Sequence, residues 1–186
     1  MNDLIIFNKP YGVICQFGAH EKHQSLKDYI DTPEFYPAGR LDTDSEGLLL
    51  LTNNGRLQAQ IAEPKYRKEK TYWAQVEGEP DSEKLTLLKN KMDLGDFVCQ
   101  PAKIRVLADD EITQIWLRNP PIRVRKTVPD FWLEIKISEG KNRQVRRMTA
   151  KAGYPCLRLI RVAVGSVNLF EQNLALGEWQ YCSVRP

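Results

Sequence analysis

The sequence predicts an α+β fold in which one large, mixed and mostly antiparallel sheet carries flanking helices. Strand-like segments outnumber helix-like segments along the 186 residues and dominate the second half. In residues 131–138 the Phe and aliphatic side chains fall on every second position, the period of a strand with one buried face. No repeat, low-complexity stretch or long linker divides the chain. We therefore expect one domain built from two lobes, about 1–65 and about 66–186.

In the first half, turn residues separate short elements. Pro10-Tyr11-Gly12 ends the first strand, and Asn53-Asn54-Gly55 ends a continuous apolar strand. Ser25-Leu-Lys-Asp28 resembles a capping box with Asp in place of Glu, and Pro64 stops a helix. We therefore expect strands at 4–9, 13–16, 48–52 and 71–76, a short helix from Ser25, and helices at about 56–63 and from Asp81 to about Asn90.

In the second half, strands dominate. Pro120-Pro121 interrupts strand pairing, Gly140 ends the alternating strand, and Gly153 is placed to cap a helix. We expect a strand marked by Ile112, Ile115 and Leu117, a strand at 131–137, a helix at 142–151, and strands at 157–162 and 166–170.

Basic residues are concentrated in one segment. Residues 118–161 carry 12 basic and 3 acidic residues, whereas residues 1–63 carry 5 basic and 9 acidic ones. This pattern is typical of a protein that contacts phosphates on one face. The alternative is a solvated basic surface with no partner.

Several classes of protein are disfavoured. The longest aliphatic run, Leu48–Leu51, is far shorter than a membrane span, and the N-terminus does not resemble a signal peptide. We therefore expect a cytoplasmic protein without membrane contact. The four cysteines are far apart and form no CxxC motif, which favours free, mostly buried thiols over a metal site.

The densest polar segment is Gly39-Arg-Leu-Asp-Thr-Asp-Ser-Glu-Gly47. Glycines bound it, and a buried strand follows at once, so a carboxylate here would be held firmly, as catalysis requires. Arg40 is close enough in sequence to help keep such a carboxylate ionised. A solvated acidic turn is the alternative.

Two further segments indicate RNA binding. Arg143, Arg146, Arg147 and Lys151 share one face of the helix expected at 142–151, while Val145, Met148 and Ala152 face the core. Clustered like charges repel each other, and phosphate neutralisation explains them better than a structural role. In residues 66–73, basic side chains are interspersed with aromatic rings, a combination that can stack on an unpaired nucleobase. Tyr72 and Trp73 also suit an ordinary strand.

These segments, in this order, resemble the bacterial ribosomal RNA pseudouridine synthases of the RsuA type. The matching motifs are Phe7-Asn-Lys-Pro-Tyr-Gly12, Gly39-Arg-Leu-Asp42 with Gly47-Leu-Leu49, Lys70-Thr-Tyr72, and Gly140-Lys-Asn-Arg-Gln-Val-Arg-Arg-Met148. The resemblance covers almost the whole chain and is greatest to the branch that modifies 23S rRNA. It implies the pseudouridine synthase catalytic fold over 1–186, with a central RNA-binding cleft and no S4 RNA-binding domain in this chain.

The resemblance also implies roles for individual residues. The family's catalytic aspartate falls on Asp42, the tyrosine beneath the target uracil on Tyr72, and the basic partner of the aspartate on Lys141. Asp44 and Glu46 lie outside the matched position and are expected to be loop residues. The expected RNA-binding residues are Arg40, Arg143 (where many relatives have histidine), Gln144, Val145, Arg146, Arg147 and Lys151.

The implied reaction isomerises a specific uridine of ribosomal RNA, with 23S favoured, to pseudouridine. The uridine leaves its stack, Asp42 acts on the nucleotide, and the freed uracil rotates and rejoins through C5. A base at or near Tyr72 removes the C5 proton, and Lys141 keeps Asp42 ionised. We expect no cofactor, no metal and no protein partner, with a monomer as the default.

Two other functions fit part of the pattern. Asp42 with Glu46 could form the carboxylate pair of a glycoside hydrolase, but the arginine-rich helix would then have no role. A non-catalytic RNA-binding module of the same fold is the second alternative. Asp42→Asn separates it from an enzyme, because the substitution spares RNA affinity and abolishes product only in an enzyme.

Overall fold

The computed structural model describes residues 3–123, 125, 127–183 and 186. The chain forms two compact units, of which one ends at Lys68 and resumes at Ile160, and the other comprises Glu69–Leu159. The division at Lys68 lies close to the lobe boundary expected near residue 65. The chain returns to the first unit at Ile160 because the strands that follow pair with N-terminal strands.

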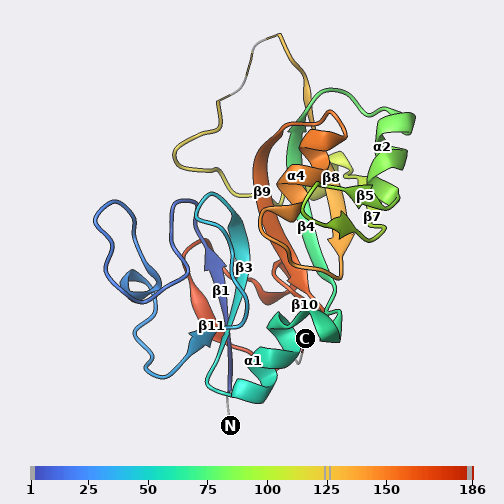
Figure 1. The fold of residues 1–186 in the computed structure, drawn as a ribbon. Coiled ribbons are helices and arrows are strands. Elements are labelled where there is room, and N and C mark those ends of the chain that lie inside the picture. Colours follow the sequence, from blue (N-terminus) through green and yellow to red (C-terminus); the bar gives the residue numbers. More distant parts are fainter. Residues whose placement is uncertain (1–2, 124, 126, 184–185) are drawn as a thin grey trace. The chain divides into compact units, whose positions relative to one another are not determined.

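The first unit is built on β1 (Leu4–Lys9) and β3 (Glu46–Thr52), whose residues are buried along their whole length. β1 lies antiparallel between β3 and β11 (Trp179–Tyr181), as Figure 1 shows. β3 also pairs in parallel with β9 (Cys156–Val164), through Glu46–Ile160 and Gly47–Arg161. The remaining elements of this unit are β2 (Tyr36–Pro37), β10 (Val167–Asn168), helix α1 (Gly55–Ala62) and three 3-10 turns at Leu26–Asp28, Pro64–Tyr66 and Phe170–Gln172.

The second unit contains an antiparallel sheet centred on β8 (Asp130–Ile137). β4 (Lys70–Glu77) pairs with β8 over all eight residues, and β7 (Lys103–Val106) pairs with its other edge. Helix α2 (Ser82–Lys89) lies against β7 (Figure 1). The unit also contains helices α3 (Asp109–Ile112) and α4 (Gln144–Lys151) and a small hairpin of β5 (Met92–Asp93) and β6 (Val98–Cys99).

The predicted α+β class is confirmed, and so is most of the predicted order of elements. The strands expected at 4–9, 48–52, 71–76, 131–137 and 157–162 all form, as do the helices expected at 56–63 and 81–90. Asn54 caps α1 by accepting hydrogen bonds from Arg56 N and Leu57 N, and Asp81 caps α2 through Lys84 N. The sequence therefore predicted correctly the strands and helices that have either a clear period or a clear cap.

The strand predicted at Val13–Gln16 is wrong. Only Ile14 makes a single bridge, to Ser25. The buried ammonium of Lys9 accounts for the difference, because its Nζ donates to the carbonyl oxygens of Pro10 at 2.9 Å and Val13 at 2.7 Å. The chain therefore curls around a cation instead of extending.

The strand predicted at Ile112–Leu117 is also wrong. Ile112 ends helix α3, and Leu117 is 94% exposed. The carboxylate of Glu111 accepts a 3.0 Å hydrogen bond from Ala108 N and turns the chain into the helix. The strand that pairs with β8 opposite β4 is β7, which lies earlier in the chain and carries a weaker apolar pattern.

Two predicted boundaries also change. The strand expected at 166–170 is only β10, because Asn168 Oδ1 accepts a hydrogen bond from Phe170 N and starts a 3-10 turn. The helix expected from Asn142 begins at Gln144, because Arg143 lies in the left-handed region at φ 51°. Gly153 has a φ of 84° and ends α4 as predicted.

Within the described part of the chain, no helix is both long enough and apolar enough to cross a membrane. All four cysteines are free thiols, of which Cys99 and Cys182 are buried and Cys15 and Cys156 are partly exposed. The described residues include no group of three His, Cys, Asp or Glu side chains that could hold a metal ion.

Candidate active site

The loop that carries Asp42 is fixed by backbone hydrogen bonds on both sides of the carboxylate. Leu41 N donates to Cys15 Sγ at 3.4 Å, and Ser45 N donates to Asp42 O at 3.0 Å. Gly12 N donates to Thr43 O at 2.8 Å, which ties the loop to the turn after β1. Asp42 itself is half-buried. Its carboxylate therefore stands on a fixed backbone, which is what a catalytic side chain requires.

Arg161, in β9, holds the two ends of this loop. Its side chain is only 3% exposed, and its Nε donates to Leu48 O at 2.8 Å. One terminal nitrogen donates to Arg40 O at 3.3 Å. Arg40 precedes the aspartate and Leu48 follows the loop, so one guanidinium fixes both ends.

Gly47 closes the loop against the same strand. It pairs with Arg161 in the parallel ladder and has a φ of 96°. A Cβ at this position would lie 2.4 Å from Arg161 O and 2.8 Å from Ile160 Cγ2. Glycine is therefore required here both by the backbone conformation and by the close approach of β9.

Buried charges lie behind the Asp42 loop. Lys9 is fully buried, and burial lowers its pKa from 10.5 to about 8. The Arg161 cation lowers the pKa further, while Cys15, Glu46 and Asp44 oppose the change. Glu46 is 1% exposed, so its carboxylate belongs to this interior group of charges rather than to the surface.

Tyr72 lies in the second unit, in the middle of β4 and opposite Ile135 of β8. It is 8% exposed. Its neighbour Trp73 points to the other face of the sheet, where Nε1 donates to Glu134 Oε2 at 3.2 Å. Of the two aromatic residues in the Lys70-Thr-Tyr-Trp segment, Trp73 thus belongs to the strand's own packing.

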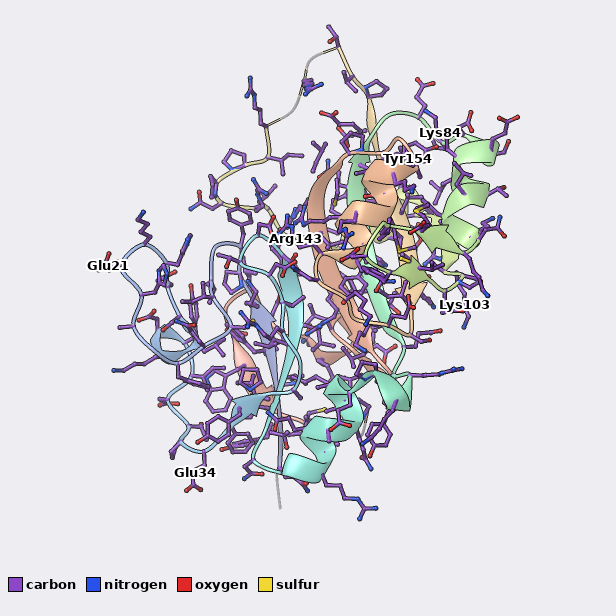
Figure 2. All side chains as sticks on the ribbon, viewed as in Figure 1. Glu21, Glu34, Lys84, Lys103, Arg143 and Tyr154 are labelled. Carbon is purple, nitrogen blue, oxygen red and sulfur yellow. The ribbon has the colours of Figure 1, made fainter. Side chains whose placement is uncertain are left out.

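Lys141 lies on the turn before α4, and Gln144 shapes that turn. Gln144 Oε1 accepts from Lys141 N at 3.2 Å, and Gln144 N donates to Lys141 O at 3.1 Å. Gln144 Nε2 donates to Glu139 Oε2 at 2.5 Å, and the residue is only 2% exposed. Arg143, labelled in Figure 2, occupies the left-handed position of the turn and is exposed.

The predicted division of α4 into two faces is confirmed. Val145, Met148 and Ala152 are buried, at 3%, 0% and 3% exposed. The basic residues have partners within this unit. Arg147 pairs with Asp96 and donates to Leu94 O at 2.8 Å, Lys151 Nζ donates to Asp93 O, and Arg146 reaches Cys156 O at 3.5 Å.

The predicted site residues thus fall on both units. Arg40 and Asp42 lie on one anchored loop of the first unit, and Tyr72, Lys141 and the α4 residues lie on the second. Lys9, Arg161 and the β5–β6 hairpin that carries Asp96 were not among the predicted site residues. The sequence did contain a signal for Arg161. An arginine within the apolar run Leu159–Val164 of a strand is expected to be buried, and a buried guanidinium needs hydrogen-bond partners.

Comparisons with known proteins identify the family of the chain. The family described as RNA pseudouridylate synthase matches residues 3–151. Ribosomal large subunit pseudouridine synthase E of Vibrio vulnificus (strain CMCP6) is 49% identical over 97% of this chain and 75% of its own. The protein of the same name from Xanthomonas campestris pv. campestris is 48% identical over 98% of this chain and 96% of its own.

A solved structure shows the same fold. The crystal structure of a pseudouridylate synthase superposes with a TM-score of 0.76 at 27% sequence identity, over 97% of this chain and 70% of that one. Sequence and structure lead to one assignment: the chain belongs to the RNA pseudouridylate synthase family.

Proposed function

We propose that the chain converts a specific uridine of large-subunit ribosomal RNA into pseudouridine, with Asp42 as the catalytic carboxylate. The observation that carries this proposal is the Asp42 loop, which is fixed at both ends by Arg161. The names of the two relatives, both large-subunit pseudouridine synthases, support the choice of substrate. From a ribosomal RNA substrate we also infer that the activity is cytoplasmic.

The reaction is an isomerisation, so the same atoms enter and leave. The target uridine is first extruded from its stack, at a cost of a few kcal/mol that is smaller in a loop. Asp42 then assists cleavage of the bond between N1 and C1′, either by attack at C1′ or by removal of a ribose proton. The uracil rotates and C5 bonds to C1′. The proton on C5 leaves to a base at or near Tyr72, and N1, which is no longer bonded to C1′, takes up a proton.

Lys141 and Tyr72 complete the proposed chemistry. We assign to the Lys141 ammonium the role of keeping the catalytic carboxylate ionised, because a cation favours the charged form of a carboxylate. The ring of Tyr72 supports the uracil, and its hydroxyl is the group next to the C5 proton. Both residues stand on fixed backbone, one in the middle of β4 and the other on the turn held by Gln144.

The proposed RNA contacts differ in strength along α4. Arg40 and Arg143 are exposed, and we assign them to phosphates together with Arg146. Arg147 and Lys151 already contact the β5–β6 hairpin, so we expect each of them to contribute less to phosphate binding. Gln144 acts through Lys141 and not by touching RNA, since its amide is buried and used within the turn. Val145 supplies apolar support beneath the site.

The experiment compares Asp42→Asn with Asp44→Asn, a substitution of the same charge on the same loop. Binding to a 23S rRNA transcript and formation of pseudouridine are measured for each. We expect Asp42→Asn to bind within about twofold of the wild type and to form no product, while Asp44→Asn remains active. A chain that only binds RNA would show no product in any variant, and product from Asp42→Asn would refute the role of Asp42.

Tyr72→Phe tests the second assignment. The ring and therefore stacking survive, so loss of product formation with normal RNA affinity would assign the hydroxyl to proton removal. Retention of the rate would restrict Tyr72 to supporting the base.

A further inference from the structure

A hairpin outside every motif described above contacts the turn of Lys141. It comprises residues 92–99, with β5 and β6 joined by a tight turn. Leu94 N donates to Phe97 O at 2.9 Å, and Gly95 N donates to Asp93 Oδ1 at 2.8 Å. These bonds make the hairpin a defined element that can hold another segment in place.

The tip of the 92–99 hairpin binds Arg147 of α4 from two sides. Asp96 accepts hydrogen bonds from both terminal nitrogens of the guanidinium, one of them at 3.2 Å, and Leu94 O accepts another at 2.8 Å. The Arg147 guanidinium carbon also lies 5.1 Å from the centroid of the Phe97 ring. A bidentate, stacked arginine has a defined orientation, which a single surface ion pair would not give it.

The same aromatic ring reaches Lys141. The Lys141 Nζ lies 5.9 Å from the Phe97 ring centroid, within the range of a cation–π contact. Lys141 is otherwise exposed, and a lysine side chain loses substantial rotamer entropy when it is held in one place. Phe97 therefore limits where the ammonium group can go.

The base of the hairpin contacts the other end of this turn. Gln100 N donates to both carboxylate oxygens of Glu139 at 3.2 Å. Glu139 also accepts from Gln144 Nε2, and Gln144 Oε1 accepts from Lys141 N. One connected set of contacts thus runs from residues 94–100 to both ends of residues 139–147.

The energies of these hairpin contacts favour a role in orienting the Lys141 turn over a role in stabilising the fold. Asp96 is 65% exposed and Arg147 33% exposed in their side chains, and such pairs contribute little to folding. Arg147 nevertheless lowers the pKa of Asp96 by hydrogen bonding, which favours the charged carboxylate. A weak but oriented contact is suited to positioning.

We propose that the 92–99 hairpin positions Lys141 for the isomerisation, with Phe97 and Asp96 as its positioning residues. Phe97 restricts the ammonium directly, and Asp96 acts by holding Arg147 against the same ring. The proposal rests on the proposed function, because it assumes that Lys141 pairs with the catalytic carboxylate.

The test uses variants of Phe97 that separate the aromatic face from apolar volume. Phe97→Leu keeps the volume and removes the π face, and Phe97→Tyr restores that face. Val98→Thr, at a position 51% exposed on the same hairpin, is the matched control. Each protein is assayed for its single-turnover rate on the 23S rRNA transcript at saturating enzyme, for RNA affinity, and for hydrogen exchange of residues 139–147.

We expect Phe97→Leu to slow product formation about tenfold, with RNA affinity within about twofold and faster hydrogen exchange at residues 139–147. Phe97→Tyr and Val98→Thr should behave like the wild type. A Phe97→Leu protein with the wild-type rate, or with wild-type exchange at 139–147, would overturn the proposal. An equal loss in Val98→Thr would also overturn it, because the effect would then be general to the hairpin fold.

Asp96→Asn gives a second test, with Asp93→Asn as its control. The Asp93 side chain accepts a hydrogen bond from Gly95 N within the hairpin turn, and its contact with Lys151 is made by the backbone. We expect a slower reaction for Asp96→Asn alone, with RNA binding only slightly more salt-dependent than in the wild type, because Arg147 loses the partner that neutralises part of its charge. Tighter, more salt-dependent binding with a normal rate would show that Asp96 masks a phosphate site instead. Absence of product from the wild type would count against the proposed function, while the exchange measurements still decide whether the hairpin holds the turn.

Discussion

The Nε of Arg161 donates a 2.8 Å hydrogen bond to the carbonyl oxygen of Leu48, a residue 113 positions earlier in the chain. A terminal nitrogen of the same guanidinium donates to Arg40 O. Because Arg40 and Leu48 flank the Asp42 loop, the position of the proposed catalytic carboxylate depends on a side chain from the strand that returns the chain to the first unit. Substitutions at Arg161 should therefore lower both the stability of the protein and its catalytic activity.

Arg161→Met should lower the free energy of unfolding by about 3 kcal/mol or more. The substitution leaves the buried Leu48 O and the partly buried Arg40 O without their donor and removes a cation from a group of buried charges. Arg161→Lys keeps the charge but cannot reach both carbonyl oxygens with the same geometry, and should recover only part of the loss. Urea denaturation measures both, and an unchanged midpoint for Arg161→Lys would show that the fork geometry is not required.

The two glycines that bound the loop give a matched pair. Both have a left-handed φ, 84° at Gly39 and 96° at Gly47, but only Gly47 has atoms within reach of a Cβ. Gly39→Ala should cost about 1–2 kcal/mol from the backbone conformation alone. Gly47→Ala should cost at least about 2 kcal/mol more, because its Cβ would lie 2.4 Å from Arg161 O. Equal costs in urea denaturation would contradict the close packing of β3 on β9.

The stability of the wild type should increase between pH 8 and about 10.5 relative to Lys9→Met. Burial lowers the pKa of Lys9 from 10.5 to about 8 in the folded protein. In this pH range the unfolded chain keeps a proton that the folded protein has lost, so raising the pH favours folding. The difference is at most about 3 kcal/mol and is complete above the unfolded pKa. Denaturation of both proteins from about pH 7 to 10 measures it, and parallel curves would mean that Lys9 keeps its ordinary pKa.

Arg143 and Arg147 should contribute unequally to RNA binding. Arg143→Asn suits the left-handed backbone there, and it should reduce the salt slope of binding to a 23S transcript by about one unit. Arg147→Gln should reduce the slope by less, because Asp96 already neutralises much of that charge. Titration of affinity against salt decides between them. Equal reductions would show that RNA displaces Asp96 completely.

Sequence patterns correctly predicted the strands and helices whose formation depends on residues close together in the chain. Strands β1, β3 and β8 follow from apolar runs or strict alternation, helix α1 from the turn at Asn53–Gly55 and the stop at Pro64, and helix α2 from its N-cap Asp81. Sequence motifs also singled out Asp42, Tyr72 and the Lys141 turn as candidate site residues. Those assignments depend on short segments whose residues stand close together in the sequence.

The failures arose where polar contacts, and not apolar patterns, decide the local structure. The chain after Pro10 curls because the Lys9 ammonium is buried, and Glu111 makes a helix because it caps Ala108 and pairs with Arg105. Likewise, no local pattern shows that Arg161 anchors the Asp42 loop across 113 positions, or that Asp96 binds Arg147. Such long-range polar contacts have no period, so a single sequence does not reveal them.

The most direct test of the central claim is incubation of protein-free 23S and 16S rRNA transcripts with the enzyme, followed by carbodiimide and primer-extension mapping of pseudouridine. Asp42→Asn and Asp44→Asn are assayed beside the wild type. We predict one new stop on the 23S transcript with the wild type and with Asp44→Asn, and none with Asp42→Asn. A stop that persists in Asp42→Asn would contradict the assignment of the catalytic carboxylate, and a stop on 16S alone would contradict the large-subunit substrate.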